Sequence, residues 1–93
     1  MIREGLLLSD QEWVRAKRDL RLSPRQAEIV RCILQCKSDK QIAHDLGISL
    51  ATVRTHLGRL FQRHKIGDRL GLILLVLACL RDGEHADEPL RDE

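Results

Sequence analysis

Aromatic side chains are almost absent from this sequence, which has one Trp, one Phe and no Tyr among its 93 residues. β-Branched residues never alternate with polar residues over the length of a strand, so the sequence lacks the pattern of a β-sheet protein. The residues that dominate instead are Leu, Ala, Arg, Gln and Glu, which all favour helices. The composition therefore predicts an all-α protein.

Long hydrophobic segments are also missing. The longest apolar run covers residues 72–80, well short of the roughly 20 residues that span a bilayer, and the N-terminus lacks the layout of a signal peptide. We therefore expect a cytoplasmic protein that makes no membrane contact. The three cysteines, at positions 32, 36 and 79, form no even framework and are predicted to be free thiols.

The length of the chain limits its domain content. A sequence of 93 residues with 43% hydrophobic content is enough for one small domain with a single core. We therefore expect no separate sensor or catalytic domain within these residues. Any regulatory signal is therefore expected to enter through this domain or through a separate regulatory protein.

Charge is distributed unevenly, although the net charge is only +2. Residues 23–67 carry 8 basic and 3 acidic side chains, whereas residues 68–93 carry 3 basic and 7 acidic ones. A local basic excess is the electrostatic footprint expected for a polyanionic partner. Residues 82–93 are predicted to form an acidic, flexible tail because they have little to bury.

Serine residues mark the predicted helix starts. Three serines are followed three residues later by Glu or Gln, the pattern of a capping box: Ser9 with Glu12, Ser23 with Gln26, and Ser38 with Gln41. Ser49 can cap a fourth helix, and a fifth is expected after the break at residues 67 and 68. The predicted helices cover residues 10–20, 24–36, 39–46, 50–64 and 69–81.

The stretch KQIAHDLGISLATVRTHLGRL, residues 40–60, has the spacing of a helix-turn-helix. Ala43 allows close approach of the next helix, Gly47 suits the tight turn, and Val53 packs back between the two helices. The buried side of the second helix is predicted to contain Val53, Leu57, Leu60 and Phe61.

The outer face of that second helix is a strip of hydrogen-bond donors. It contains Thr52, Arg54, Thr55, Arg59, Gln62 and Arg63, and no acidic residue lies between Val53 and Gly67. A helix that only needed solubility would usually mix charge signs. The strip therefore favours a helix that binds nucleic acid over a helical hairpin that only packs within the protein.

The segment LSPRQAEIVRCILQCKSDKQIAHDLGISLATVRTHLGRLFQRHKIGDR resembles the DNA-binding domain of LuxR-type (GerE-like) transcriptional regulators. The usual run in that family contains Asn-Lys-Glu-Ile-Ala and then Thr-Val-Lys-x-His. The resemblance implies a four-helix domain over residues 22–81, here preceded by one extra helix within an N-terminal extension, residues 1–21. It also implies that the third domain helix enters the major groove and that the fourth mediates dimerisation.

The resemblance also implies roles for single residues. Arg54 takes the place of the basic base-reading residue, and Thr55 follows it on the groove side. Thr52 stands where the family has a phosphate-facing Thr, Lys40 could meet phosphate from the start of the scaffold helix, and His56 matches a frequent His. The predicted DNA-binding residues are Lys40, Thr52, Arg54, Thr55, His56, Arg59, Gln62 and Arg63.

Three positions depart from the family pattern. Gln26 replaces the usual Glu and leaves a neutral cap partner. Cys36 stands where Gly often closes the first domain helix, which implies either a cysteine with positive φ or a shifted helix end. Gly58 stands where a second base-reading side chain is often found, so readout is expected to depend on Arg54, Arg59 and Gln62.

The fifth predicted helix is apolar on all sides between residues 72 and 80. We expect Ile73, Leu77 and Leu80 to cover the core, and the other faces to form the interface of a homodimer. The interface residues are predicted to be Leu72, Leu75, Val76 and Cys79. The alternative is that the N-terminal helix, ordered and packed through Trp13, covers the same face within the monomer.

Other kinds of site find less support in the sequence. Cys32 and Cys36 are one helical turn apart, but no second close pair completes a zinc site, and a redox switch at Cys36 depends only on its position. The sequence contains no Gly-rich phosphate loop, no paired carboxylates on a buried face and no activated nucleophile, so it does not predict an enzyme. The sequence therefore predicts a stand-alone transcriptional regulator that binds double-stranded DNA without metal or cofactor. The rival interpretation is a helical adaptor that binds a protein.

Overall fold

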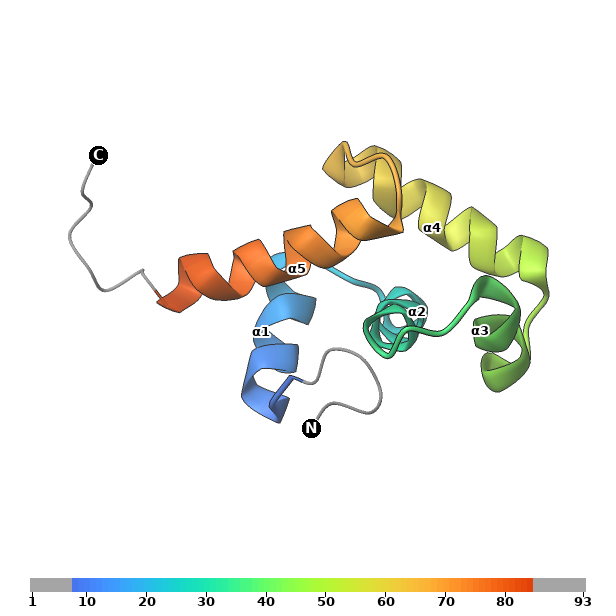
Figure 1. Ribbon diagram of the computed structural model, residues 1–93, viewed down its shortest axis with the longest axis horizontal. Coiled ribbons are helices and arrows are strands. Elements are labelled where there is room, and N and C mark those ends of the chain that lie inside the picture. The colour runs from blue at the N-terminus through green and yellow to red at the C-terminus, as the bar shows by residue number, and fades with distance from the viewer. Residues whose placement is uncertain (1–7, 85–93) are drawn as a thin grey trace.

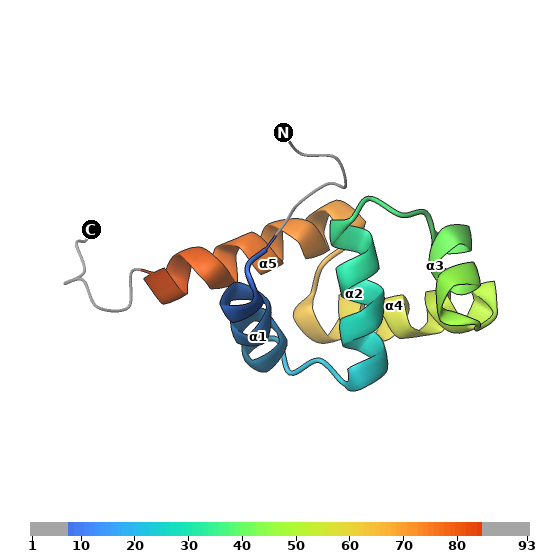
Figure 2. The same ribbon diagram turned by 90° about the horizontal axis from the view of Figure 1, so that it is seen from below.

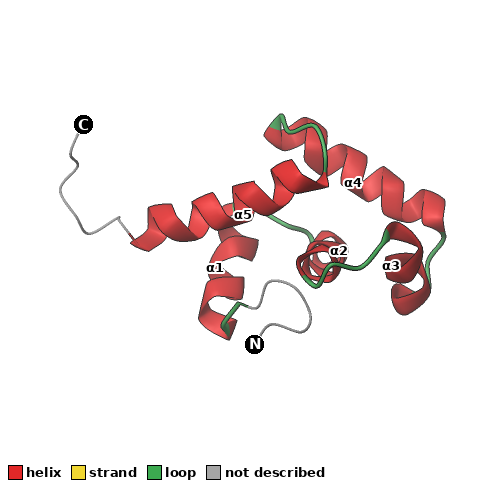
Figure 3. Cartoon of the chain, in the orientation of Figure 1, coloured by secondary structure: helices red, strands yellow, loops and turns green. Residues whose placement is uncertain are grey.

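The computed structural model of the protein describes residues 8–84, with side chains up to residue 81, and this part of the chain folds into helices without any strand. The helices are α1 (Asp10–Asp19), α2 (Pro24–Leu34), α3 (Asp39–Leu46), α4 (Leu50–His64) and α5 (Arg69–Glu84). Figure 1 and Figure 3 show their arrangement. The all-α prediction is confirmed.

The helices begin where the serine pattern predicts. Ser9 Oγ accepts a hydrogen bond from the Glu12 amide at 3.1 Å, and Glu12 Oε1 accepts one from the Ser9 amide at 2.9 Å. The same reciprocal capping box opens α2 and α3, and Ser49 Oγ caps α4. At the start of α5, Asp68 accepts a hydrogen bond from the backbone N–H of Gly71 at 2.9 Å.

Helices α1 to α4 all end with a residue in the left-handed region, and only one of these residues is glycine. They are Arg21, Cys36, Gly47 and Lys65, with φ between 54° and 67°. After each, the next amide donates to the carbonyl five residues earlier, as Ile48 does to Ala43 at 3.0 Å. For Cys36 the sequence implied either a positive φ or a shifted helix end. The structure shows both, since φ is 66° and α2 ends at Leu34.

Helix α2 lies at the centre of the fold and contacts α3, α4 and α5 (Figure 2). Its Ile29, Val30 and Ile33 are almost completely buried. Helix α1 packs against α5, and Trp13 of α1 is only 8% exposed. The N-terminal helix, which was expected to be ordered and to pack either on its own domain or on a second subunit, is therefore ordered and packs on its own domain.

The orientation of α5 corrects the predicted assignment of its faces. Leu72 and Val76 have no exposed surface, whereas Leu77 is 39% exposed. Leu72, Val76 and Leu80 are four residues apart, so they share one face of the helix, and that face packs on the core. Leu72 and Val76 were therefore wrongly placed on an outer surface, and α1 covers α5 within the monomer, as the alternative interpretation held.

The same register determines which apolar side chains face outward. Leu70 and Leu74 are 60% and 56% exposed, while Leu75 and Cys79 are partly buried against the core. None of the helices in the described part of the chain is long and apolar enough to cross a membrane.

Candidate nucleic-acid interface

Helices α3 and α4 form an angled pair joined by a short turn (Figure 1). Ile42 and Val53 have no exposed surface at the junction, and Ala43 is 8% exposed, so the two helices approach closely. Gly47 adopts φ 67° in the turn, a conformation that glycine reaches without a steric penalty. The local geometry is the one that the spacing of residues 43, 47 and 53 predicts.

The structure places most of the predicted donors together on the outer face of α4. Arg54, Thr55, Arg59 and Gln62 are exposed, and we call these four residues the α4 strip. Thr52 and His56, also on α4, are half-buried. Lys40 is exposed in the first turn of α3. Gly58 interrupts the strip, and nothing lies within 4 Å of where its Cβ would be.

Thr52 takes part in the cap of α4. Its amide donates to Ser49 Oγ at 3.0 Å, and Ser49 Oγ donates to Thr52 Oγ1 at 2.8 Å. Because the Thr52 hydroxyl accepts in this pair, its own proton can be donated outward. The start of α4 therefore presents a hydroxyl donor beside the positive end of a helix dipole, where an anion is favoured.

Arg54 has an acidic neighbour that the sequence interpretation missed. Its Nε lies 3.5 Å from Asp39 Oδ2, and Arg69 Nη1 from α5 lies 3.1 Å from Asp39 Oδ1. Arg69 also donates to the backbone carbonyl of Lys37. The sequence did contain a sign of this neighbour, because Asp39 places an acidic residue where the LuxR-type run has the neutral Asn. No local signal indicated Arg69, which is 30 residues further along the chain.

Arg63 is exposed like the α4 strip, but its guanidinium donates to backbone carbonyls outside α4. Nη2 donates to the carbonyl of Leu20 at 2.9 Å and to that of Arg21 at 3.0 Å. These carbonyls lie just past the end of α1. Arg63 therefore connects the C-terminal end of α4 to α1, and its place among the DNA-binding residues is not supported by this geometry.

Every acidic side chain within residues 23–67 forms an ion pair with Arg or Lys. Glu28 pairs with Arg25 at 3.1 Å, and Asp45 pairs with Lys37 at 2.7 Å. The hydrogen bond from Lys37 lowers the pKa of Asp45. Among the residues that the structure describes, Lys40 and Arg59 have no carboxylate partner, so their charges face solvent and can meet a polyanion.

The cysteines are free thiols, and the described side chains offer no group of three or more ligands that could hold a metal ion. Cys32 is buried, and burial raises the pKa of its thiol. Cys32 therefore packs in the core as a small hydrophobic residue. Cys36 is exposed at the end of α2.

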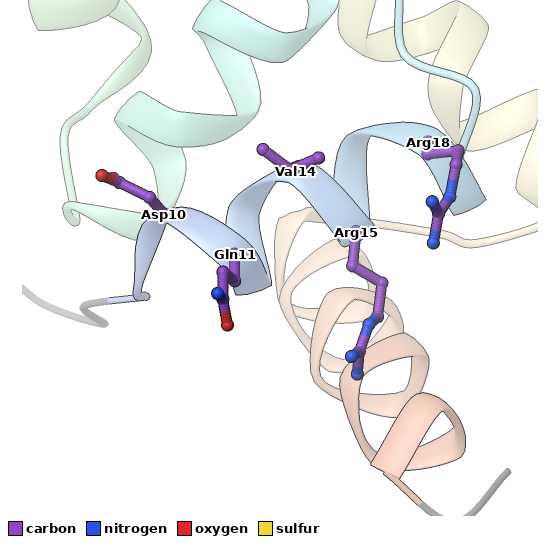
Figure 4. Close-up of a pocket in the computed structure, with 5 residues that line it drawn as sticks. All are labelled: Asp10, Gln11, Val14, Arg15 and Arg18. Carbon is purple, nitrogen blue, oxygen red and sulfur yellow. The ribbon is translucent and has the colours of Figure 1, made fainter.

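One surface hollow lies along the outer side of α1. It is lined by Asp10, Gln11, Val14, Arg15 and Arg18 (Figure 4). These side chains all come from one helix, and none of them is buried. Such a hollow lacks the enclosed apolar lining and converging polar groups of a small-molecule site.

Comparison with known proteins identifies a family and a relative. A family model described as "Bacterial regulatory proteins, luxR family" (GerE) matches residues 20–83. A monoamine regulon transcriptional regulator of Klebsiella aerogenes is 38% identical over 52 residues, which are 56% of this chain and 23% of that protein. The chain thus spans about a quarter of the length of this relative. No solved structure matched the chain significantly.

Proposed function

The chain belongs to the luxR family of bacterial regulatory proteins, and from this we propose that it binds double-stranded DNA in a sequence-specific way and regulates transcription. The observation that carries this proposal is the α4 strip, which is exposed, basic and free of acidic residues. The matched residues 20–83 include all of α2, α3 and α4. A B-DNA major groove admits an α-helix, and we propose that α4 is that helix.

Different residues have different roles in this proposal. Arg54 and Thr55 read base edges from the first half of α4, since arginine can bind guanine O6 and N7 with two donors. Lys40 and Thr52 contact phosphate at the starts of α3 and α4. Arg59 contacts the DNA from further along α4, as Gln62 and His56 also do. Stand-alone action and a cytoplasmic location stay predictions.

Fluorescence anisotropy over a range of salt concentrations tests DNA binding directly. For a DNA-binding protein, log affinity for random duplex should fall steeply with log salt, because bound phosphates release counterions. A protein-binding adaptor with the same fold would bind little DNA at any salt concentration. That outcome would contradict the proposal.

Two variants separate base reading from phosphate binding at a site selected from random sequence. Arg54→Ala should weaken binding to that site by about 1–3 kcal/mol and relax the preference at one base position per half-site. Lys40→Ala should weaken selected and random DNA together and reduce the salt slope by about 1. Equal losses of Arg54→Ala on both DNAs would show that Arg54 contacts only phosphate.

We also propose that the protein binds DNA as a homodimer through α5, but by a different face from the one the sequence predicted. Leu70, Leu74 and Leu77 are exposed and follow the i, i+4, i+7 spacing of one helix face. Leu75 and Cys79 keep partial exposure and remain candidates at its edge. A symmetric pair would present two α4 helices to half-sites about one helical turn apart.

Sedimentation tests the dimer. Leu74→Glu should still fold, because the Leu74 side chain does not belong to the core. It should be monomeric and should bind a site with two half-sites much more weakly. Leu70→Lys serves as a second variant on the same face and should act in the same direction. If the unmodified protein is monomeric at high concentration and on DNA, the dimer proposal is wrong.

A further inference from the structure

Asp39 lies between two arginines that come from different helices. It belongs to α3, Arg54 to α4 and Arg69 to α5. We propose that Asp39 and Arg69 are positioning residues that orient Arg54 for base reading, so that the specificity of the protein depends on a residue at the start of its C-terminal helix. This inference rests on the proposed DNA-binding function and extends it.

The geometry divides the two oxygens of the Asp39 carboxylate between the arginines. Oδ1 is 3.1 Å from Arg69 Nη1, and Oδ2 is 3.5 Å from Arg54 Nε. The side chain of Asp39 is 28% exposed and that of Arg69 is 36% exposed, whereas that of Arg54 is 64% exposed. Arg69 is therefore the more enclosed partner that fixes the carboxylate, and Arg54 is the partner that extends toward solvent.

The backbone around Asp39 is held as well. Arg69 donates through Nη2 to the carbonyl of Lys37, two residues before Asp39, and the Asp39 carboxylate sits in the first turn of α3, where the helix dipole favours a negative charge. The contact with Arg54 uses Nε. Its two terminal nitrogens consequently remain available to bind a guanine edge with two donors.

Charge explains why Arg69 is needed. A carboxylate close to the DNA-reading face would repel phosphate and would also compete with DNA for Arg54. Arg69 neutralises Asp39, so that the carboxylate can orient Arg54 without retaining a full unpaired charge. Asp39 also stands where the LuxR-type run has Asn, so a single substitution to Asn tests the effect of the charge with little change in shape.

The experiment measures the ratio of affinities for selected and random duplex DNA. Asp39→Asn should tighten binding to random DNA, because repulsion is lost, and should lower the ratio by about 2- to 5-fold, the size expected for an exposed ion pair. Asp45→Asn is the matched control, since Asp45 is also on α3 but pairs with Lys37 instead of Arg54. It should tighten binding to both DNAs and leave the ratio unchanged.

A double-mutant cycle with Arg54 identifies the route of the effect. In the Arg54→Ala background, Asp39→Asn should no longer change the ratio. Arg69→Gln should lower the ratio in the original protein and leave it unchanged in the Arg54→Ala background, and Arg69→Lys should restore part of it. If Arg69→Gln fails to fold, as judged by circular dichroism, the Asp39→Asn cycle still decides.

The inference fails if Asp39→Asn and Asp45→Asn change the ratio equally, or if Asp39→Asn lowers it as much without Arg54 as with it. Both results would leave DNA binding by the unmodified protein intact. Absence of salt-dependent DNA binding by the unmodified protein would instead contradict the proposed function itself.

Discussion

Replacing Arg63 by methionine should loosen the connection between α4 and α1 while leaving both helices formed. Arg63 Nη2 donates to the carbonyls of Leu20 and Arg21 at 2.9 Å and 3.0 Å. Methionine keeps most of the aliphatic stem but removes the donors. The carbonyl of Leu20 is part-buried, so its hydrogen bond is only incompletely replaced by water.

The expected magnitude follows from the geometry of this contact. A hydrogen bond with one charged partner contributes about 1.5–3 kcal/mol. Both bonds come from one nitrogen, and the one to Arg21 is exposed, so we take the lower end, about 1.5 kcal/mol of unfolding free energy. At about 4–8 °C per kcal/mol for a domain of this size, the melting temperature should fall by about 6–12 °C.

Urea unfolding followed by two signals tests this expectation. Trp13 lies on α1 and is 8% exposed, so its fluorescence reports the docking of α1, while far-UV circular dichroism reports all helices. Arg59→Met is the matched control, because it removes the same charge from α4 at a position that makes no described hydrogen bond or ion pair. Equal unfolding midpoints for Arg63→Met and Arg59→Met would refute the structural role of Arg63.

Three further predictions concern the core, helix α4 and the thiols. Leu72→Ala should lower the unfolding free energy by about 2–5 kcal/mol because Leu72 is fully buried, whereas Val14→Ala, at an exposed position of α1, should change it by less than about 0.5 kcal/mol; chemical denaturation measures both. Gly58→Ala should raise thermal stability by about 0.5–1 kcal/mol, since nothing lies within 4 Å of the added Cβ, and a lower melting temperature would contradict this. Iodoacetamide should alkylate the exposed Cys36 well before Cys32, whose thiol pKa is raised by burial, and peptide mass mapping would show the reverse order if this is wrong.

The helix starts were predictable from the sequence because each depends on residues three positions apart. A Ser followed by Glu or Gln at that spacing contains both halves of the cap, and the structure shows both hydrogen bonds at Ser9, Ser23 and Ser38. The buried side of α4 was predictable for a similar reason. Val53, Leu57 and Leu60 repeat with the period of a helix between polar residues, so the pattern indicates the inward direction.

The orientation of α5 could not be predicted because its sequence carries no such signal. Apolar side chains occupy every position from 72 to 80, so every face is equally suited to the core. The inward face is determined by the packing of α1 and α2 on α5, which are distant in sequence. The same holds for the contact of Arg69 with Asp39 and for that of Arg63 with the end of α1, since neither leaves a local pattern.

The local nature of the helix boundaries has a consequence for the speed of folding. Helices α1 to α4 each begin with a contact across three residues and end with one across five. Closing such short loops costs little chain entropy, and helical segments of this kind form within about a microsecond. Helical proteins rich in local contacts fold in microseconds to milliseconds. We therefore expect the docking of α1 on α5, the contacting pair of helices farthest apart in sequence, to be the slowest step as the chain folds.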